Sequence, residues 1–288
     1  MAVIHPFAYH NGTVLPSQEV RLSPFQTGLL TGWGLFSTLR IYQGVPFALE
    51  DHWARLASDG LRLHVDLGGM EERMRDGFAQ LIAKNDAQEA MARVYFIRNR
   101  GGLLDVAGQA ATDILMFTAN LRDWGASARL RLQPTARQAM HPLAGTKTLT
   151  WAHNLVLLEE ATQAGYDDVL LLNERGEVAE CTAANVFAVK KGLLLTPPIE
   201  ESGALAGVSR KHILKACARH GIPVEVRSLR PEDLFTADEV FISSSTREVQ
   251  PVHEIDGHAI PFGPMSQKIE TIFQQEVQEY VAARVAGR

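Results

Sequence analysis

The sequence has few cysteines and no long apolar run, and each shortage argues against a class of protein. Two cysteines, Cys181 and Cys217, cannot build a disulfide framework, which favours a reducing compartment. The first ten residues lack the basic and apolar regions of a signal peptide, and no stretch approaches the roughly 18 apolar residues of a membrane span. We therefore expect a cytoplasmic protein without a membrane segment.

An excess of charge of one sign is also absent. Charged residues make up 21% of the 288 residues, both signs are mixed along the chain, and the net charge is −5. This distribution predicts no basic face for nucleic acid or anionic lipid. The length and the 46% of hydrophobic residues allow two cores or one large one. We expect two domains, a small molecule as partner and no metal ion.

The first part of the chain has the pattern of an α/β domain over residues 1–120. Asn11-Gly12 and Gln43-Gly44 are turn signals between segments rich in β-formers, which predicts two hairpins. Hydrophobic spacing then predicts helices over 50–63 and 70–84 and strands over 92–98 and 113–119. Residues 121–128, with Trp124-Gly125, are predicted to connect this domain to the next.

A second α/β domain is predicted over residues 129–288. Its first helix, over 150–164, is followed by Gly165, and a later helix, over 209–220, is followed by Gly221. Short strands, several of them antiparallel, and a C-terminal helix from Met265 complete it. The predicted strands cover 129–133, 169–172, 178–180, 185–189, 193–195 and 240–243.

Lysine is scarce, with only seven in the chain, and six of them have an ordinary place in a helix or a turn. Lys147 differs, because it lies between Gly145 and the start of a largely apolar helix. Burial there disfavours the ammonium form and lowers the pKa of the amine, as a lysine that forms a Schiff base requires. The alternative from the residues alone is that Lys147 only caps a loop.

From about Pro24 to Pro264 the chain resembles the class IV aminotransferases, the fold-type IV enzymes that use pyridoxal phosphate. Five separated blocks carry the resemblance in the order of the family. They are Glu50-Asp-His-Trp-Ala-Arg-Leu56, the Lys147 segment, Val178-Ala-Glu-Cys-Thr-Ala-Ala-Asn-Val-Phe187, Leu205-Ala-Gly-Val-Ser-Arg210 and Val240-Phe-Ile-Ser-Ser-Ser-Thr-Arg-Glu-Val-Gln-Pro-Val252. The resemblance implies an α+β, two-domain fold with the active site between the domains, and a homodimer.

The resemblance also implies a set of cofactor-binding residues. Lys147 stands where the family places the lysine that bonds pyridoxal phosphate and then carries a proton, and Glu180 stands where the family places the carboxylate beside the pyridine nitrogen. A phosphate would meet donors at the start of a helix and in a turn, and a basic side chain. The residues implied for the phosphate and for the face of the ring are Arg55, Leu205, Gly207, Val208, Ser209, Ser245 and Thr246. Cys181 has no basic neighbour in sequence and is interpreted as a packed residue.

Substrate residues follow from weaker similarities. The segment Gly32–Arg40 matches the family's substrate-side strand and suggests Trp33, Phe36 and Arg40 as lining residues, although an ion pair of Arg40 is an alternative. Arg98 ends Tyr95-Phe-Ile-Arg98, which is one residue longer than the Tyr-x-Arg of branched-chain enzymes. The loop Gly102–Val106 lacks both the Arg-x-His of D-amino-acid enzymes and the Arg-Gly-Tyr of the lyases.

Arg247 departs from the family, which usually has a small residue after the threonine of this turn. One hypothesis is that its guanidinium binds a substrate carboxylate and favours a dicarboxylic partner such as glutamate. The alternative is a salt bridge to Glu248 or another neighbour. The sequence leaves both open.

The function expected from the resemblance is the transfer of an amino group between an amino acid, apolar or branched-chain, and a 2-keto acid such as 2-oxoglutarate. The alternatives are a 4-amino-4-deoxychorismate lyase, a D-amino-acid aminotransferase and, last, a dimer that binds the cofactor without catalysis. The lyase would release pyruvate without an acceptor, and the transferase would require one. The sequence does not decide among substrates or between L and D stereochemistry.

Overall fold

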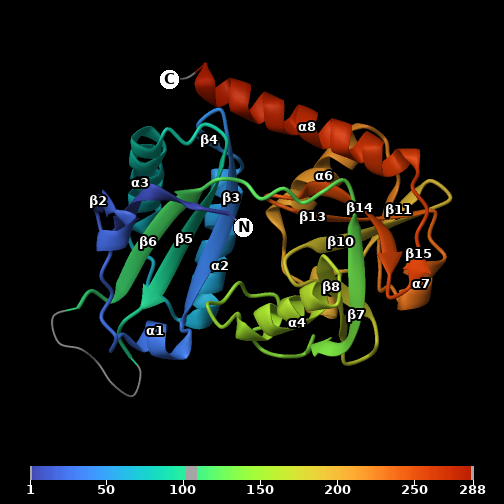
Figure 1. Ribbon diagram of the computed structural model, residues 1–288, viewed down its shortest axis with the longest axis horizontal. Coiled ribbons are helices and arrows are strands. Elements are labelled where there is room, and N and C mark those ends of the chain that lie inside the picture. Colours follow the sequence, from blue (N-terminus) through green and yellow to red (C-terminus); the bar gives the residue numbers. More distant parts are fainter. Residues whose placement is uncertain (1, 102–108, 287–288) are drawn as a thin grey trace. The chain divides into compact units, whose positions relative to one another are not determined.

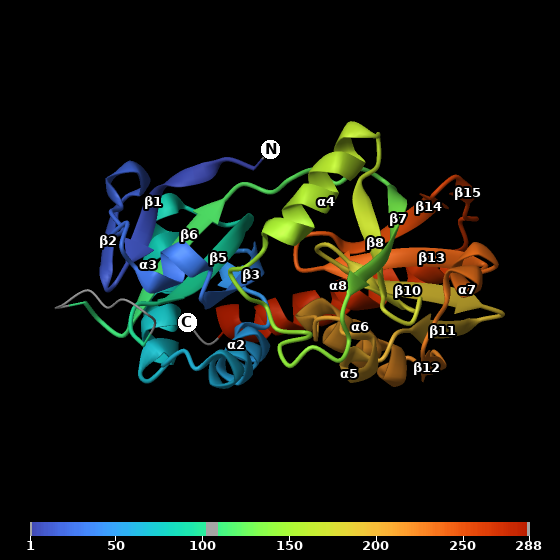
Figure 2. The ribbon, with the colours of Figure 1, turned by 90° about the horizontal axis from the view of Figure 1, so that it is seen from below.

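The computed structural model describes residues 2–101 and 109–286 and comprises two compact units (Figures 1 and 2). Unit 1 contains the described residues up to Arg122, the segment Thr146–Trp151 and the C-terminal stretch from Tyr280. Unit 2 contains Asp123–Gly145 and Ala152–Glu279. The described part of the chain includes no helix that is long and apolar enough to cross a membrane.

Unit 1 is built on a six-stranded antiparallel sheet with the strand order β2-β1-β6-β5-β3-β4. Both predicted hairpins are confirmed, and Asn11, Gly12, Gln43 and Gly44 have the positive φ angles that their turns require. The elements are β1 Ile4–His10, β2 Thr13–Pro16, η1 Ser17–Glu19, α1 Thr27–Thr31, β3 Gly34–Tyr42, β4 Val45–Pro46, α2 Leu49–Leu63, α3 Met70–Asn85, β5 Ala90–Arg98 and β6 Thr112–Ala119.

The two faces of this sheet differ in burial because successive side chains of a strand point to opposite sides. On one face the paired residues Leu35 and Phe96, and Ser37 and Val94, are all 0% exposed, and helix α2 contacts this face through its hydrogen bonds to Ser37. The other face, which we call the open face, remains partly exposed. It contains Phe36, Thr38, Arg40, Met91, Arg93, Tyr95, Leu115 and Phe117.

Unit 2 is built on a nine-stranded mixed sheet with the path β12-β11-β10-β13-β14-β7-β8-β9, and β15 pairs with β14. Strand β7 is parallel to both of its neighbours, β8 and β14. The elements are β7 Ala128–Arg137, α4 Ala152–Gln163, β8 Asp168–Asn173, β9 Val178–Cys181, β10 Asn185–Lys190, β11 Leu193–Thr196, α5 Ile199–Ser202, α6 Val208–Arg219, β12 Val224–Val226, α7 Pro231–Phe235, β13 Glu239–Ser244, β14 Glu248–Ile255, β15 His258–Ala259 and α8 Pro264–Val285.

The helices and strands predicted from hydrophobic spacing are present, and their ends differ from the prediction by a few residues. The sequence prediction missed short elements such as α1, α5 and α7, which have too few residues to show a period. It also missed β14, which contains Pro251. This strand accommodates a proline, which has no N–H to donate.

The two units do not follow the chain as simply as the predicted domains do. One division lies at Arg122 and Asp123, within the predicted connection, but the segment of Lys147, predicted as part of the C-terminal domain, belongs to unit 1. The reason is that its segment pairs with β3: Leu149 donates to the Gly34 carbonyl at 3.0 Å, and Leu35 and Thr148 form an antiparallel bridge. The end of α8 also belongs to unit 1, where Arg284 forms an ion pair with Glu50.

Candidate active site

The main chain of Lys147 is held by unit 1 on both sides of the residue. The Lys147 N–H donates to Asp59 Oδ2 at 3.2 Å, and the Lys147 carbonyl accepts from the Phe36 N–H at 3.2 Å. Asp59 lies on α2 and Phe36 on β3, so a helix and a strand fix the residue together. The segment that carries Lys147 is therefore an added edge of the unit 1 sheet.

The side chain of Lys147 lies among aromatic rings at the open face. Its Nζ is 4.6 Å from the ring centroid of Phe36 and 4.6 Å from that of Trp151. These two rings meet edge to face, and Tyr95 stacks on Phe36 at 5.7 Å. Aromatic faces attract a cation, and the apolar rings also remove water from an amine. Phe36, predicted as a lining residue, is thus beside Lys147.

Arg55 projects from α2 toward β3. Its Nη2 donates to Ser37 Oγ at 2.9 Å, and Ser37 Oγ is 2.8 Å from Nδ1 of the buried His52. Arg55 and Asp59 are one helical turn apart on α2, so they lie on the same side of the helix. The structure therefore places Arg55 and Lys147 next to the same short stretch of β3.

Sequence reasoning missed two residues on the open face. Tyr95 is paired with Phe36, and Arg93 is paired with Thr38, so both point to the side of the sheet that carries Phe36. Arg93 Nη1 donates to the Tyr95 hydroxyl at 3.1 Å, and its guanidinium carbon is 5.8 Å from the Phe36 ring. The signal was the alternation of β5, which puts residues 93 and 95 on one face.

The structure gives structural partners to two of the arginines that were predicted to meet substrate. Arg40 forms an ion pair with Glu89 at 2.7 Å, which is the alternative that the sequence left open. Arg98 donates to the carbonyl oxygens of Arg100 and His64, and its guanidinium lies 3.9 Å from the Trp33 ring. Both arginines thus have partners within the protein, and their roles toward substrate stay predictions.

Trp33 has a partner as well, since its Nε1 donates to the Leu63 carbonyl at 2.7 Å. Its ring is covered on one face by Arg98. The loop 102–106, which carries the differences between subfamilies, lies outside the described residues.

In unit 2, Glu180 forms an ion pair with Arg137. Its Oε1 accepts from Arg137 Nε at 3.1 Å, and its Oε2 accepts from the Leu205 N–H at 3.0 Å. Glu180 is 8% exposed, and its ion pair with Arg137 is partly buried on both sides. Sequence reasoning missed Arg137. The structure brings Glu180 and Leu205, two predicted cofactor residues, into direct contact.

The start of α6 has the form expected of an anion site. Gly207 is the N-cap, Val208 and Ser209 open the helix, and both are buried. A Cβ on Gly207 would be 1.9 Å from Asn185 Oδ1, so only glycine fits beside this side chain. Asn185 in turn donates to the Leu205 carbonyl at 2.9 Å, which fixes the chain before the helix.

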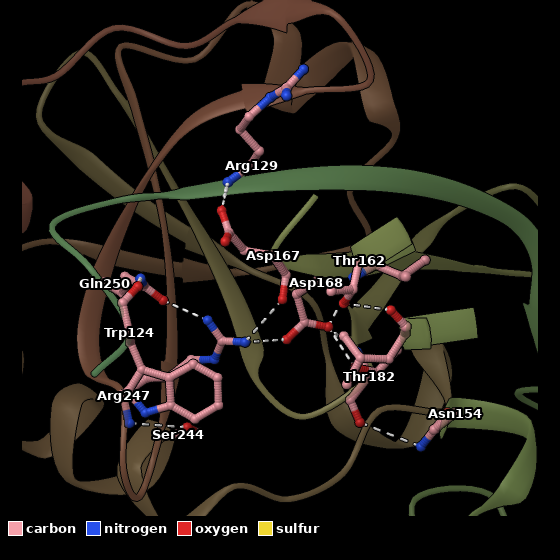
Figure 3. A network of polar contacts seen from close by, with 12 residues as sticks. Trp124, Arg129, Asn154, Thr162, Asp167, Asp168, Thr182, Ser244, Arg247 and Gln250 are labelled. Carbon is pink, nitrogen blue, oxygen red and sulfur yellow. Dashed lines mark hydrogen bonds and ion pairs between the residues drawn. The ribbon is translucent and has the colours of Figure 1, made fainter. Parts of the chain in front are cut away.

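Ser245 and Thr246 lie in a turn after β13, as predicted, and both are partly exposed. Arg247 follows them and turns inward. Its Nη2 lies 2.8 Å from Asp168 Oδ2, its Nη1 donates to Gln250 Oε1 at 2.6 Å, and its guanidinium carbon is 3.8 Å from the Trp124 ring (Figure 3). This is the salt-bridge alternative, with Asp168 in place of Glu248. The guanidinium that was hypothesised to bind a substrate carboxylate is enclosed within unit 2.

Asp168 connects the turn to the Glu180 strand. Its Oδ1 accepts from both the N–H and the hydroxyl of Thr182, two residues beyond Glu180, while its Oδ2 accepts from Arg247 (Figure 3). One buried carboxylate therefore fixes two of the predicted cofactor-binding segments. Cys181 lies between them and is fully buried. Burial raises the pKa of its thiol, which agrees with a packed residue.

Comparisons with known proteins match this arrangement to one family. A family model described as amino-transferase class IV matches residues 34–255. A putative branched-chain-amino-acid aminotransferase of Methanocaldococcus jannaschii is 31% identical over 275 residues, which cover 92% of this chain and 94% of that protein. A D-alanine aminotransferase of Bacillus licheniformis is 26% identical and covers 96% of this chain and 98% of its own length.

A solved structure shows the same fold. The branched-chain aminotransferase of the archaeon Thermoproteus uzoniensis, determined with norvaline, superposes with a TM-score of 0.84. It is 24% identical in sequence, and the match covers 96% of this chain and 96% of that one. At this identity the likeness concerns the fold alone.

Proposed function

Because the chain belongs to the class IV aminotransferase family, we propose that it uses pyridoxal phosphate to move an amino group between an amino acid and a 2-keto acid such as 2-oxoglutarate. The observation that carries the proposal is the placement of Lys147. Its main chain is fixed by Asp59 and Phe36, and its amine lies 4.6 Å from each of two aromatic rings. A fixed amine beside apolar rings is prepared to act as a nucleophile.

The residues present fit the cofactor. Within unit 1, Lys147 offers an amine and Arg55 a guanidinium. Within unit 2, Glu180 offers a carboxylate and the start of α6 offers N–H groups. When bound, pyridoxal phosphate supplies an aldehyde that bonds an amine and a pyridinium ring that withdraws electrons from the substrate. Glu180 holds the proton of the ring nitrogen by hydrogen bonding. We assign the phosphate to Arg55, Gly207, Val208, Ser209, Ser245 and Thr246, and one face of the ring to Leu205.

Lys147 has a second role in this proposal. Its free amine accepts the proton from the substrate Cα at Nζ and later returns one. The rings of Phe36 and Trp151 flank the amine at 4.6 Å each and limit the directions from which a substrate can approach it.

The open face supports an apolar amino acid and a dicarboxylic partner. Phe36, Tyr95 and Trp151 form an aromatic wall, which suits a branched-chain side chain. Arg93 has no carboxylate partner among the salt bridges of the described residues, and it lies on the same face. We propose that it meets the second carboxylate of glutamate or 2-oxoglutarate.

We propose a homodimer in the cytoplasm. Exposed apolar residues gather around α1, where Phe25 is 69%, Leu29 48% and Leu30 62% exposed, and such a group suits an interface with a second copy. Both cysteines are free thiols, which fits a reducing compartment.

The test of the function is direct. The purified protein is incubated with pyridoxal phosphate, reduced with borohydride and digested, and mass spectrometry must locate the label on Lys147. Lys147→Ala must abolish the label and the transfer of amino groups to 2-oxoglutarate. Lys84→Ala is the matched control, because Lys84 Nζ also lies near an aromatic ring, 4.7 Å from Phe7.

The same protein preparation also tests whether the substrate is an L- or a D-amino acid. The relation to a D-alanine aminotransferase favours a D-amino acid as a second candidate substrate. A panel of L- and D-amino acids with 2-oxoglutarate as acceptor separates the two. Release of pyruvate from aminodeoxychorismate without an acceptor would instead identify a lyase.

A further inference from the structure

Asp59 is a buried acid that accepts a hydrogen bond from the main chain of Lys147. It lies on α2, is 3% exposed, and accepts the Lys147 N–H through Oδ2 at 3.2 Å. The two residues are 88 positions apart in sequence. Contact between them is therefore a feature of the tertiary structure of unit 1.

Three hydrogen bonds join the main chain of the Lys147 segment to β3 and α2, and they are of two kinds. The bonds from Phe36 N to Lys147 O and from Leu149 N to Gly34 O connect backbone groups, which every sequence supplies. The bond to Asp59 depends on a side chain. Of these three bonds, only the one to Asp59 can be removed by substituting a side chain.

The charge of Asp59 is surrounded by basic groups. Arg55, Arg62 and Lys147 all interact electrostatically with it. On α2 the titratable and charged groups near Asp59 are His52, Arg55 and Arg62, whereas Arg93 and Tyr95 of β5 lie on the open face beside the Phe36 ring that the Lys147 amine contacts. Asp59 is the acidic member of this group.

Burial nevertheless raises the pKa of Asp59, because the loss of water outweighs the hydrogen bond from Lys147 and the nearby cations. An asparagine has nearly the same shape and can accept the same bond without a buried charge. A carboxylate at such a place is costly for the fold, and perturbed acids of this kind are frequent at functional sites.

We propose that Asp59 is a positioning residue for Lys147. Its carboxylate fixes the main chain of the lysine so that the amine lies at Phe36 and Trp151, and its negative charge stabilises the protonated form of the lysine nitrogen. This inference rests on the proposed function, in which Lys147 bonds the cofactor. A purely structural role of Asp59 would change the stability of unit 1 and leave the properties of the lysine nitrogen unchanged.

The experiment compares the wild type with Asp59→Asn, Asp59→Ala and the control Asp76→Asn, which changes an exposed acid on α3. Each protein is freed of cofactor and mixed with pyridoxal phosphate. Absorbance gives the rate at which the bond to Lys147 forms and, in a second titration, the pH midpoint at which the bonded lysine nitrogen loses its proton. Borohydride reduction and mass spectrometry confirm that Lys147 carries the label.

We expect Asp59→Ala to form the bond at least about tenfold more slowly, because the amine is no longer held in place. Asp59→Asn keeps an acceptor and should react at nearly the wild-type rate, but its pH midpoint should fall by about one unit because an opposite charge is missing. Asp76→Asn should match the wild type in both measurements.

The proposal is overturned if Asp59→Asn has the wild-type midpoint or if Asp59→Ala reacts at the wild-type rate. Should Asp59→Ala fail to fold, the midpoint of Asp59→Asn decides alone. If the wild type itself forms no bond at Lys147, the proposed function is wrong. If the wild type forms the bond at Lys147 and the Asp59 variants have its rate and its pH midpoint, only the inference about Asp59 is wrong.

Discussion

Arg247 Nη2 and Asp168 Oδ2 are 2.8 Å apart, and neither side chain is more than 1% exposed. The pair is bonded further on both sides, Arg247 to Gln250 and Asp168 to Thr182 (Figure 3). It therefore connects the turn that contains Thr246 with the strand that contains Glu180. A guanidinium enclosed in this way serves the architecture of unit 2.

Replacing Arg247 with methionine should be costly, because the charge of Asp168 loses its buried partner. We expect the free energy of unfolding to fall by about 3–5 kcal/mol in a urea titration. Arg129→Met is the control, since the Arg129 side chain is 38% exposed and pairs with Glu254, and exposed pairs of this kind contribute little to stability. The ratio of kcat/KM for 2-oxoglutarate to that for a monocarboxylic keto acid should not change. A selective loss for 2-oxoglutarate would restore the hypothesis that Arg247 binds substrate.

Arg93→Met should specifically impair the reaction with the dicarboxylic acceptor. The loss of a hydrogen bond to a charged group lowers kcat/KM for 2-oxoglutarate by about 10- to 100-fold, while a monocarboxylic keto acid is affected much less. Arg40→Met is the matched control on the same face, because Arg40 already pairs with Glu89. Steady-state kinetics with both acceptors measure the effect. Equal losses for the two acceptors would argue against a carboxylate site at Arg93.

The stability of Asp59→Asn should depend on pH in a defined direction. Burial raises the pKa of Asp59, so the folded protein holds its proton to a higher pH than the unfolded chain does. The wild type therefore loses stability as pH rises from about 4 through the folded pKa, and asparagine has no such loss. We expect thermal unfolding curves of the two proteins to converge in acid and the variant to gain in relative stability toward neutral pH. A variant that is less stable at neutral pH than in acid, relative to the wild type, would contradict this linkage.

Neither thiol should react in the folded protein. Cys181 and Cys217 are buried, and burial raises the pKa of the Cys217 thiol to about 11, so roughly one molecule in a thousand has a thiolate there at pH 8. Ellman's reagent should modify both cysteines rapidly after denaturation and only very slowly before it. Rapid reaction of one thiol in the native protein would show that its segment opens.

Local patterns determined much of the fold. The turns at Asn11-Gly12 and Gln43-Gly44, and the apolar spacing of α2 and α3, depend on neighbours in the sequence and were predicted correctly. The family was identified from blocks of residues whose order and spacing are carried by the chain itself. Lys147 and Glu180 were found in this way.

Tertiary structure decided which charged groups have partners. In sequence, three arginines are similar candidates for binding a substrate carboxylate. In the fold, Arg40 pairs with Glu89, Arg98 donates to backbone carbonyls, and Arg247 pairs with Asp168. Arg93 was overlooked because only the register of β3 and β5 shows that it shares the open face with Phe36.

The sequence by itself determined the elements and the family and singled out Lys147 as a candidate, because these depend on residue type and short-range spacing. The tertiary structure alone decided that Lys147 belongs to unit 1 and that Asp59 holds it. The physical reason is that the free energy of a charged or polar side chain is set by burial and by the partners within a few ångströms. Residues as distant in the chain as Asp59 and Lys147 become such partners only when the chain folds.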